Sequence, residues 1–510
     1  MRVTRWVSSP KVLETAVNSA PTLMVPQHAR HPAIAVGAGG GPPGPGDDLF
    51  PRAPASAIAS IAPMALLTRL DLRGAKGAAG DLRARLPAPK AAGQGSLQTV
   101  REILAAVKAG GDSAVGELTR RFDGVHPPRL RVPDKEVQAA RDQIPADLLE
   151  ALEEAARSIR GFHEAERAAH HSFEYVSDHG VVTRELLLPV GRAGCYAPGG
   201  RAPLASTVLM TAIPARVAGV DEVAVCCPPG RDARVPAAVL AAAAVAGVDE
   251  VYAMGGAQAI AALAYGTNSV GAVDVIVGPG NFYVATAQRL VAEEGVVGVP
   301  SAFAGPSEVV VVADGTAPVE YAALDLVVQA EHGPDGLAWL VCWSEEVAMA
   351  VEEAVDRLAA ESPRQAEVTA TLEQGGWSVL VDGPEQAMDV CNVVAPEHLE
   401  LITATPEALV PLVRSAGAVF CGPWAPASVG DYLAGPSHVL PTARSARFSS
   451  ALGTQDFMKR VHVVSLDQAA LRRVAPHVAA IARAEGLAAH AGSVLGRADV
   501  QTDAQAGVMP

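Results

Sequence analysis

Two short polar motifs in the second half of this chain have residue types that suit metal binding and proton transfer. Gln329 and His332 are three residues apart at the end of a helix-like stretch, so a helix would place them on one face. An amide oxygen and a neutral imidazole nitrogen can both bind a divalent metal. Glu397 and His398 are adjacent and offer a carboxylate and an imidazole as proton acceptors. Together the motifs suggest one site that combines a metal with a base.

A metal site needs more ligands than Gln329 and His332 supply. Read alone, Gln329 and His332 also fit a polar helix C-terminus that is ended by Gly333-Pro334. The chain offers three further candidates, all remote in sequence: Asp431, His438 and His490. Spacing does not choose among them, so metal binding is a hypothesis at this level.

The second motif also has an ordinary structural reading. Glu397 and His398 stand at the start of a predicted strand, where the pair could simply face solvent. Neighbouring strand residues point to opposite faces of a sheet. A shared site therefore requires irregular backbone at this position.

The elements that must position these residues follow a repeating pattern after Gly191. Short apolar strands alternate with amphipathic or Ala-rich helices, which is the spacing of βα units in parallel sheets. The predicted strands are 222–227, 249–254, 273–277, 308–313, 337–343, 377–381 and 418–421. We therefore expect an α/β fold with parallel sheets covered by helices.

A break at Gly305-Pro306-Ser307 suggests two α/β domains with appendages. Residues 1–63 are rich in Pro and Gly, as in linkers or disordered segments, and Met64 could be the true start of the functional chain. The predicted division is an arm at 64–96, a first domain of 97–195 with 307–452, a second domain of 196–306, and a helical C-terminal segment at 453–510.

The composition excludes several classes of protein. The 510 residues include 49% hydrophobic and 19% charged residues, which suits a soluble globular enzyme. A net charge of −15 gives no reason to expect nucleic acid or anionic membrane as a partner. There is no membrane-span candidate, secretory signal or CxxC motif, so we expect a cytoplasmic protein with reduced cysteines.

Three glycine-rich turns indicate a nucleotide site. Tyr196 lies in Gly194-Cys-Tyr, Gln258 ends Gly255-Gly-Ala-Gln, and Asn281 ends Gly278-Pro-Gly-Asn. A turn between a strand and a helix N-terminus can hold phosphate groups. Each turn alone is typical of any βα unit, but three on consecutive units favour a nucleotide.

These motifs, in this order, resemble the histidinol dehydrogenase family over about residues 97–490. The resemblance is carried by Gly191-Arg-Ala-Gly-Cys-Tyr-Ala-Pro-Gly-Gly, Gly255-Gly-Ala-Gln-Ala-Ile-Ala, Gly278-Pro-Gly-Asn, Ala304-Gly-Pro-Ser-Glu, Gln329-Ala-Glu-His-Gly-Pro-Asp, Ala395-Pro-Glu-His-Leu-Glu, Gly430-Asp-Tyr and Gly435-Pro-Ser-His-Val-Leu-Pro-Thr. It implies two Rossmann-like domains of aldehyde-dehydrogenase-like architecture. It also implies a homodimer with one Zn²⁺ per subunit, which oxidises L-histidinol via L-histidinaldehyde to L-histidine with two NAD⁺, ending histidine biosynthesis.

The resemblance also implies residue roles. The zinc ligands would be Gln329, His332, Asp431 and His490. Substrate contacts would come from Ser307, Gln329, His332, His398, Asp431, Glu485 and His490, with Glu485 and His490 contributed across the dimer interface. NAD would contact Tyr196, Gln258 and Asn281, and the acid–base residues would be Glu397 and His398.

The implied chemistry matches the residue types. His398 would take the alcohol proton as hydride leaves to NAD⁺, and Glu397 would activate the water that hydrates the bound aldehyde. His398 would then assist the second hydride transfer. The zinc would act mainly as a template that orients the imidazole and amine of the substrate.

Three alternatives remain at this stage. A paralogue could oxidise another small polyol, such as a sulfonated propanediol, although Glu485 and His490 argue against it. Cys195 could be a nucleophile that forms a thiohemiacetal with the aldehyde. A dimer with an inactive site could have a structural or regulatory role.

Overall fold

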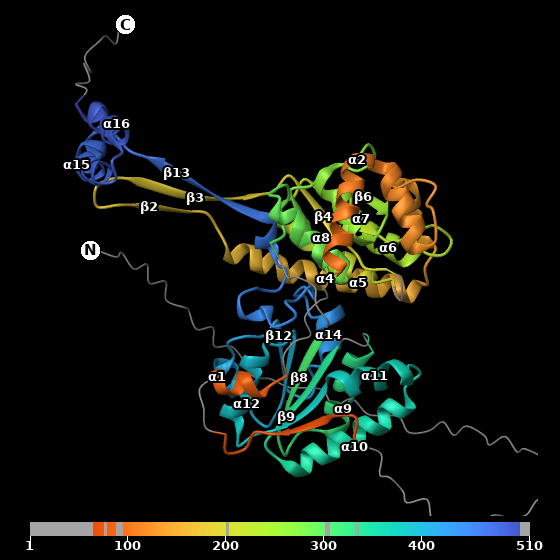
Figure 1. Ribbon diagram of the computed structural model, residues 1–510. Helices are drawn as coiled ribbons and strands as arrows, with labels where there is room; N and C mark the ends of the chain where they lie inside the picture. The colour runs from red at the N-terminus through yellow and green to blue at the C-terminus, as the bar shows by residue number, and fades with distance from the viewer. Residues whose placement is uncertain are drawn as a thin grey trace, which may run out of the picture. The chain divides into compact units, whose positions relative to one another are not determined.

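The computed structural model describes residues 65–75, 79–87, 95–199, 203–300, 307–331, 333 and 336–499 (Figure 1). The chain divides into two compact units, Met1–Ala62 and Pro63–Pro510, and all described residues belong to the second. The predicted Pro/Gly-rich extension, Met64 and His332 lie outside the described residues.

A six-stranded parallel sheet, with its connecting helices, holds the predicted residues His398, Gln329 and Asp431. Its strand order is β1-β10-β9-β8-β11-β12. The strands are β1 (Thr68–Asp71), β8 (Glu308–Ala313), β9 (Leu337–Cys342), β10 (Gly376–Leu380), β11 (His398–Ile402) and β12 (Ala418–Cys421). The central strands are continuous apolar runs because helices cover both faces of the sheet.

Two separate cores lie on the two faces of this sheet. One is formed with α9 (Val319–Ala330), α10 (Glu345–Glu361) and α11 (Gln365–Gly375). The other is formed with α1 (Ala79–Arg85), α12 (Pro384–Val394) and α13 (Pro406–Leu409). Helix α14 (Ala427–Tyr432) follows β12.

A second, four-stranded parallel sheet has the order β6-β5-β4-β7. Its strands are β4 (Arg192–Tyr196), β5 (Glu222–Cys227), β6 (Glu250–Ala253) and β7 (Val275–Val277). One face packs on α3 (Asp134–Ala139), α4 (Ala146–Ala169), α5 (Ala205–Ala218) and α6 (Ala237–Ala246), and the other on α2 (Gly95–Asp123), α7 (Gly256–Tyr265) and α8 (Phe282–Glu293). The short 3₁₀ helices of the chain are η1 (Ala140–Asp142), η2 (Val410–Leu412), η3 (Ser445–Arg447) and η4 (Thr454–Phe457).

The expected α/β class with parallel sheets is confirmed. The division between the domains differs in detail from the predicted one. Strand β4 pairs within the four-stranded sheet, and α2 and α4 pack on that sheet, although residues 97–195 were assigned to the other domain. Helices that precede the first strand of a unit give no sequence signal for which sheet they cover.

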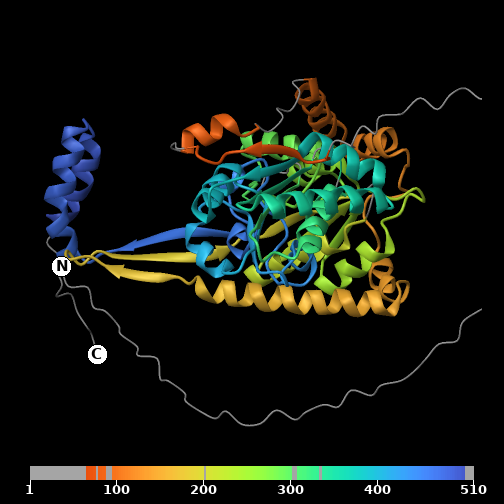
Figure 2. The same ribbon diagram turned by 90° about the horizontal axis from the view of Figure 1, so that it is seen from below.

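A three-stranded antiparallel arm completes the fold. Its strand order is β13-β3-β2, formed by β2 (Phe173–Val176), β3 (Val182–Pro189) and β13 (Met458–Ser465). Eight paired residues of β3 and β13 span about 26 Å at the usual rise of a strand. Figures 1 and 2 show the arm as yellow and blue strands that lead to two blue helices.

Those helices are α15 (Gln468–Ala484) and α16 (Ala488–Ala498), which pack on each other through small alanine contacts. The predicted helical C-terminal segment thus contains two helices, and Gly486 with φ 77° lies between them. Helix α15 contacts the tip of the β2–β3 hairpin, where Arg473 Nε donates to the His179 carbonyl at 3.0 Å. The helical pair therefore lies at the far end of the arm. Among the described residues, no helix combines the length and apolar character that crossing a membrane requires.

Candidate active site

The predicted base residues meet others at the amino ends of β8 and β11. These two strands are neighbours in the six-stranded sheet, with β9, β10 and β1 on one side and β12 on the other. Glu308 begins β8 and Ser307 precedes it, while His398 begins β11 and Glu397 precedes it. The pairing of His398 with Val309 fixes the register of the two strands. Parallel pairing therefore gathers these four residues at the amino-terminal ends of two neighbouring central strands.

Irregular backbone brings the Glu397–His398 pair into one site, as the sequence analysis required. Helix α12 ends at Val394, and the next residue, Ala395, has the left-handed conformation with φ 49°. Glu397 therefore lies outside the regular strand. Its Oε2 accepts the Glu308 backbone N–H at 3.1 Å and lies 3.7 Å from His398 Nδ1. The opposite ring nitrogen, Nε2, is 3.7 Å from Asp431 Oδ1.

The site is almost fully buried, and this shifts the pKa of its groups. Burial raises the pKa of Glu397, although the neighbouring His398 opposes the change. Burial would lower the pKa of His398, but Glu397 and Asp431 outweigh it and raise the value. His398 Nδ1 is buried and has no hydrogen-bond partner among the described residues. This arrangement suits a side chain that exchanges protons with a bound molecule.

Glu308 is an acidic residue of this site that the sequence analysis did not assign. Its side chain is 1% exposed, and Oε2 has no hydrogen-bond partner among the described residues. Burial and the nearby Glu397 raise the pKa of Glu308 to about 8. Its carboxyl faces the backbone N–H groups of Ala443 and Arg444, two residues with positive φ. A charged residue at the first position of an otherwise apolar strand, next to Ser307, is the signal that could have identified it.

The predicted metal ligands lie in different surroundings. Gln329 lies in the last turn of α9 and is 4% exposed, while Asp431 lies in the last turn of α14 beside His398. His332 is outside the described residues. His490 is exposed on α16, and Figure 1 places α15 and α16 at the end of the arm, away from α14. Among the described residues, no cluster of three His, Cys, Asp or Glu side chains could hold a metal.

His438, the third remote metal candidate, has hydrogen bonds at both ring nitrogens. Nδ1 lies 2.9 Å from the Asp431 carbonyl, so it carries the proton and donates. Nε2 lies 3.1 Å from the Thr207 hydroxyl on α5. His438 therefore connects the end of α14, which carries Asp431, to a helix of the other sheet.

Gln329 and Asp431 nonetheless fit a divalent cation by type. They supply an amide oxygen and a carboxylate, and a buried imidazole with an unpartnered nitrogen lies next to Asp431. Oxygen and nitrogen donors of this kind are suited to zinc. His490, the remaining predicted ligand, is on α16 beyond the arm and does not lie with them.

The three predicted nucleotide contacts lie at the carboxyl ends of the four-stranded sheet. The strand order reverses between β4 and β7, which is where parallel α/β sheets bind ligands. Tyr196 ends β4, and its hydroxyl accepts the Gly256 N–H at 3.1 Å. Asn281 follows β7 and caps α8 through Oδ1, which accepts the Tyr283 N–H at 3.0 Å. Gln258, in the first turn of α7, is 1% exposed.

The turn after β7 is built for close approach to β4. Gly278 has φ 114°, and a Cβ atom there would lie 2.2 Å from the Tyr196 carbonyl oxygen. Only glycine fits such a position. The glycine thus brings the N-terminus of α8 next to the end of β4, which is the arrangement that holds a pyrophosphate.

The structure does not support the cysteine alternative. Cys195 has no exposed surface, and burial raises the pKa of its thiol to about 12. A nucleophilic cysteine needs an accessible thiolate. All six cysteines are free, as the sequence predicted.

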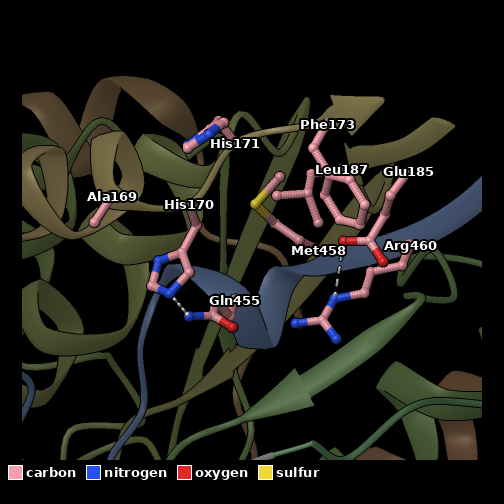
Figure 3. A pocket seen from close by; sticks show the side chains of 9 residues that line it. All are labelled: Ala169, His170, His171, Phe173, Glu185, Leu187, Gln455, Met458 and Arg460. Carbon is pink, nitrogen blue, oxygen red and sulfur yellow. Dashed lines mark hydrogen bonds and ion pairs between the residues drawn. The ribbon is translucent and has the colours of Figure 1, made fainter. Parts of the chain in front are cut away.

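A hollow of about 530 Å³ lies at the base of the arm and contains none of the predicted site residues (Figure 3). Gln455 Nε2 lies 2.6 Å from His170 Nε2, and Arg460 Nε lies 3.8 Å from Glu185 Oε1. The other lining residues are Ala169, His171, Phe173, Leu187 and Met458. The hollow thus combines apolar side chains from β2, β3 and β13 with polar groups.

Comparisons with known proteins agree with one another. The family profile described as histidinol dehydrogenase matches residues 87–498. A histidinol dehydrogenase of Parasynechococcus marenigrum is 46% identical over 392 residues, or 77% of this chain and 89% of that protein. One of Aromatoleum aromaticum is 44% identical over 435 residues, or 85% and 98%. The crystal structure of histidinol dehydrogenase from Elizabethkingia anophelis has a TM-score of 0.80 at 31% identity, covering 85% of this chain and 98% of that chain.

Proposed function

The chain belongs to the histidinol dehydrogenase family, and we propose that it oxidises L-histidinol to L-histidine with NAD⁺. The observation that carries this proposal is the meeting of Ser307, Glu397, His398 and Asp431 at one edge of the six-stranded sheet. An alcohol becomes a carboxylic acid by losing four electrons, so each histidinol should yield two NADH. Purified protein supplied with zinc, histidinol and NAD⁺ tests this stoichiometry. Failure to form NADH under these conditions would contradict the proposal.

The proton transfers are assigned to the buried pair. His398 accepts the alcohol proton as hydride moves to the nicotinamide, because its ring is buried and Nδ1 has no hydrogen-bond partner among the described residues. Glu397 activates water for hydration of the aldehyde. Its raised pKa makes it a stronger base than an exposed carboxylate. Burial also retains the aldehyde, which would otherwise react with amines.

The metal is assigned to Gln329, His332 and Asp431 of one chain together with His490 of the partner subunit. When bound, Zn²⁺ would orient the imidazole and amine of the substrate. Ser307 of the same chain would complete the substrate contacts together with Glu485 of the partner subunit. Two observations support this assignment: Gln329 is a buried polar side chain, and Asp431 Oδ1 lies 3.7 Å from His398 Nε2.

The nucleotide is assigned to the reversal point between β4 and β7. Its pyrophosphate would lie at the N-terminus of α8, behind the glycine turn. Asn281 already uses Oδ1 for the helix cap, so its Nδ2 is the group that would reach NAD. Tyr196 lies at the end of β4, beside the proposed nucleotide. Its hydroxyl already accepts the Gly256 N–H, so another part of the residue would contact NAD.

A homodimer is the proposed assembly, because the arm exposes apolar side chains that need a cover. Phe173, Tyr175 and Val464 are 53%, 59% and 62% exposed, and Ile481 on α15 is 62% exposed. Exposed large apolar side chains gathered on one element are typical of an interface. A second copy lying along the arm would cover it, and could fill the hollow at the base of the arm (Figure 3). The same arrangement would bring the partner's Glu485 and His490 to the base pair.

A further inference from the structure

Gln288 is a buried polar residue of α8 to which the proposed reaction assigns no role. Its side chain is 1% exposed, and it lies seven residues, or about two turns, after the N-cap Asn281. Its Oε1 is buried and has no hydrogen-bond partner among the described residues. Burying an amide costs free energy unless its polar atoms are bonded, so the presence of Gln288 inside this helix layer requires an explanation.

The bond that Gln288 does make reaches back to the glycine turn before α8. Its Nε2 donates to the Gly278 carbonyl at 3.1 Å, and this contact is buried. A carbonyl can only accept, so the contact also fixes which end of the amide faces the turn. A buried backbone carbonyl needs a partner, and Gln288 supplies one.

The turn is held against α8 at both of its ends. At its far end, Asn281 Oδ1 caps the helix. Before it, a Cβ atom on Gly280 would lie 2.3 Å from Val284 Cγ1, so the backbone there packs directly on the first turn of α8. At its near end, the bond from Gln288 holds Gly278, the residue that also approaches β4. The turn and the N-terminus of α8 are therefore held as one unit beside the end of β4.

Few N–H groups at this helix start are available to a phosphate. Pro279 has none, and Asn281 Oδ1 accepts those of Tyr283 and Val284. The N–H groups that remain are those of residues 280–282. They lie between the Gly278 carbonyl and the cap, so the backbone conformation that Gln288 fixes at one end sets their direction.

We propose that Gln288 is a positioning residue for the nucleotide: its bond to the Gly278 carbonyl holds the turn so that the N–H groups of residues 280–282 point at the pyrophosphate of NAD⁺. This inference rests on the proposed NAD⁺-dependent function, and it names a residue that acts on the nucleotide through the backbone without touching it.

The test is direct binding of NAD⁺ to the full-length, zinc-loaded protein, measured by titration calorimetry. Gln288→Met removes the N–H donor and keeps an unbranched side chain of similar length, so the dissociation constant for NAD⁺ should rise about 10-fold. In steady-state assays the KM for NAD⁺ should rise by a similar factor, while the KM for histidinol should not change. A general folding defect would instead affect both substrates and the zinc content.

Gln288→Glu is a second variant that removes the same bond. At pH 8 a carboxylate of this size can only accept, so it cannot bond to the Gly278 carbonyl. NAD⁺ binding should weaken at least as much as in the Met variant. Agreement between an apolar and a polar replacement would assign the effect to the lost donor.

Thr286→Val is the matched control. Thr286 lies on the same helix and is also buried, at 6% exposed. Its replacement changes a buried polar group of α8 but leaves the bond between Gln288 and Gly278 in place. NAD⁺ binding should therefore be unchanged.

A measurement on the unaltered protein tests the same geometry without relying on the folding of any variant. NAD⁺ should slow amide hydrogen exchange in the peptide that covers residues 278–288, because the N–H groups of residues 280–282 would be bonded to phosphate. Equal exchange in this peptide with and without saturating NAD⁺ would overturn the inference.

Two results with the variants would also overturn it. One is a folded Gln288→Met protein that binds NAD⁺ as tightly as the unaltered chain. The other is a Thr286→Val protein that loses NAD⁺ as readily as the Met variant. An unaltered chain that binds NAD⁺ but does not oxidise histidinol is a different result, because it overturns the proposed substrate and leaves the role of Gln288 standing.

Discussion

Glu308 holds Glu397 through its backbone: its N–H donates to Glu397 Oε2 at 3.1 Å, while its own carboxyl lies buried beside the same group. The backbone N–H of Glu308 thus orients the Glu397 carboxylate and lowers its pKa, while Glu397 in turn raises the pKa of the Glu308 carboxyl. The two acids lie on adjacent parallel strands, so the register of the sheet sets their separation.

The first prediction concerns stability and pH. Burial raises the pKa of Glu308 from 4.5 to about 8, so the folded chain binds a proton that the unfolded chain releases over this range. The stabilisation from this proton is complete below pH 4.5 and is lost as pH rises toward 8. Glu308→Gln removes the effect. From pH 5 to 8 the unaltered chain should lose roughly 3–4 kcal/mol more unfolding free energy than the variant, measured by urea unfolding at each pH. Parallel curves of unfolding free energy against pH for the two proteins would contradict this prediction.

The second prediction concerns the base in both steps. His398→Ala should lower turnover of histidinol by about 10²- to 10⁴-fold, the usual contribution of a general base. Zinc content should stay near normal, because His398 is not one of the proposed ligands. Steady-state NADH formation and metal analysis measure the two effects. His126→Ala, an exposed histidine near α2, is the control and should change neither.

The third prediction separates the two oxidations. Glu397→Gln keeps a carbonyl oxygen that can accept the Glu308 N–H, so the local structure should be retained. The amide cannot take a proton from water. Oxidation of supplied histidinaldehyde should therefore slow by about 10² or more, and the first hydride transfer from histidinol should slow less. Equal losses in both steps would argue against a water-activating role.

The fourth prediction concerns the metal. Asp431→Asn preserves size and leaves the hydrogen bond from His438, which is made to the backbone carbonyl. Only the charge is removed, so α14 should stay in place while zinc is released on dialysis. Stoichiometric zinc retained by a folded variant would refute Asp431 as a ligand.

The fifth prediction tests whether His490 serves the partner's site. His398→Ala and His490→Ala should each be inactive alone. Refolding or co-expressing them together produces mixed dimers in which one site has both histidines intact. About one quarter of normal activity should then return, since half of the dimers are mixed and half of their sites are complete. If His490 acted within its own chain, no activity would return.

Most strands of the two parallel sheets were predictable from their apolar runs, but β1 and β4 were not predicted. Strands 222–227, 308–313 and 418–421 were predicted with the bounds that the structure has. The arm strands β2, β3 and β13 were not predicted. None of their residues is fully buried, so they lack the pattern that identifies a buried strand.

The site was only partly predictable from the residues themselves. Glu397 and His398 are adjacent in the sequence, so their proximity was predictable. That they share a site depends on the left-handed conformation of Ala395, which the conformational preference of alanine does not predict. Asp431 reaches His398 because β12 lies next to β11. Which strands are neighbours is a property of the whole sheet, so spacing along the chain could not choose among the remote ligands.

The length of the arm has a consequence for how this protein works in solution. Glu485 and His490 lie on the helical pair beyond an arm about 26 Å long, so under the proposed roles a separated subunit would lack part of both its metal shell and its substrate contacts. Dilution below the dissociation constant of the dimer would therefore stop both oxidations together. Specific activity would then depend on protein concentration. Each subunit would be active only while its partner supplies the side chains of Glu485 and His490.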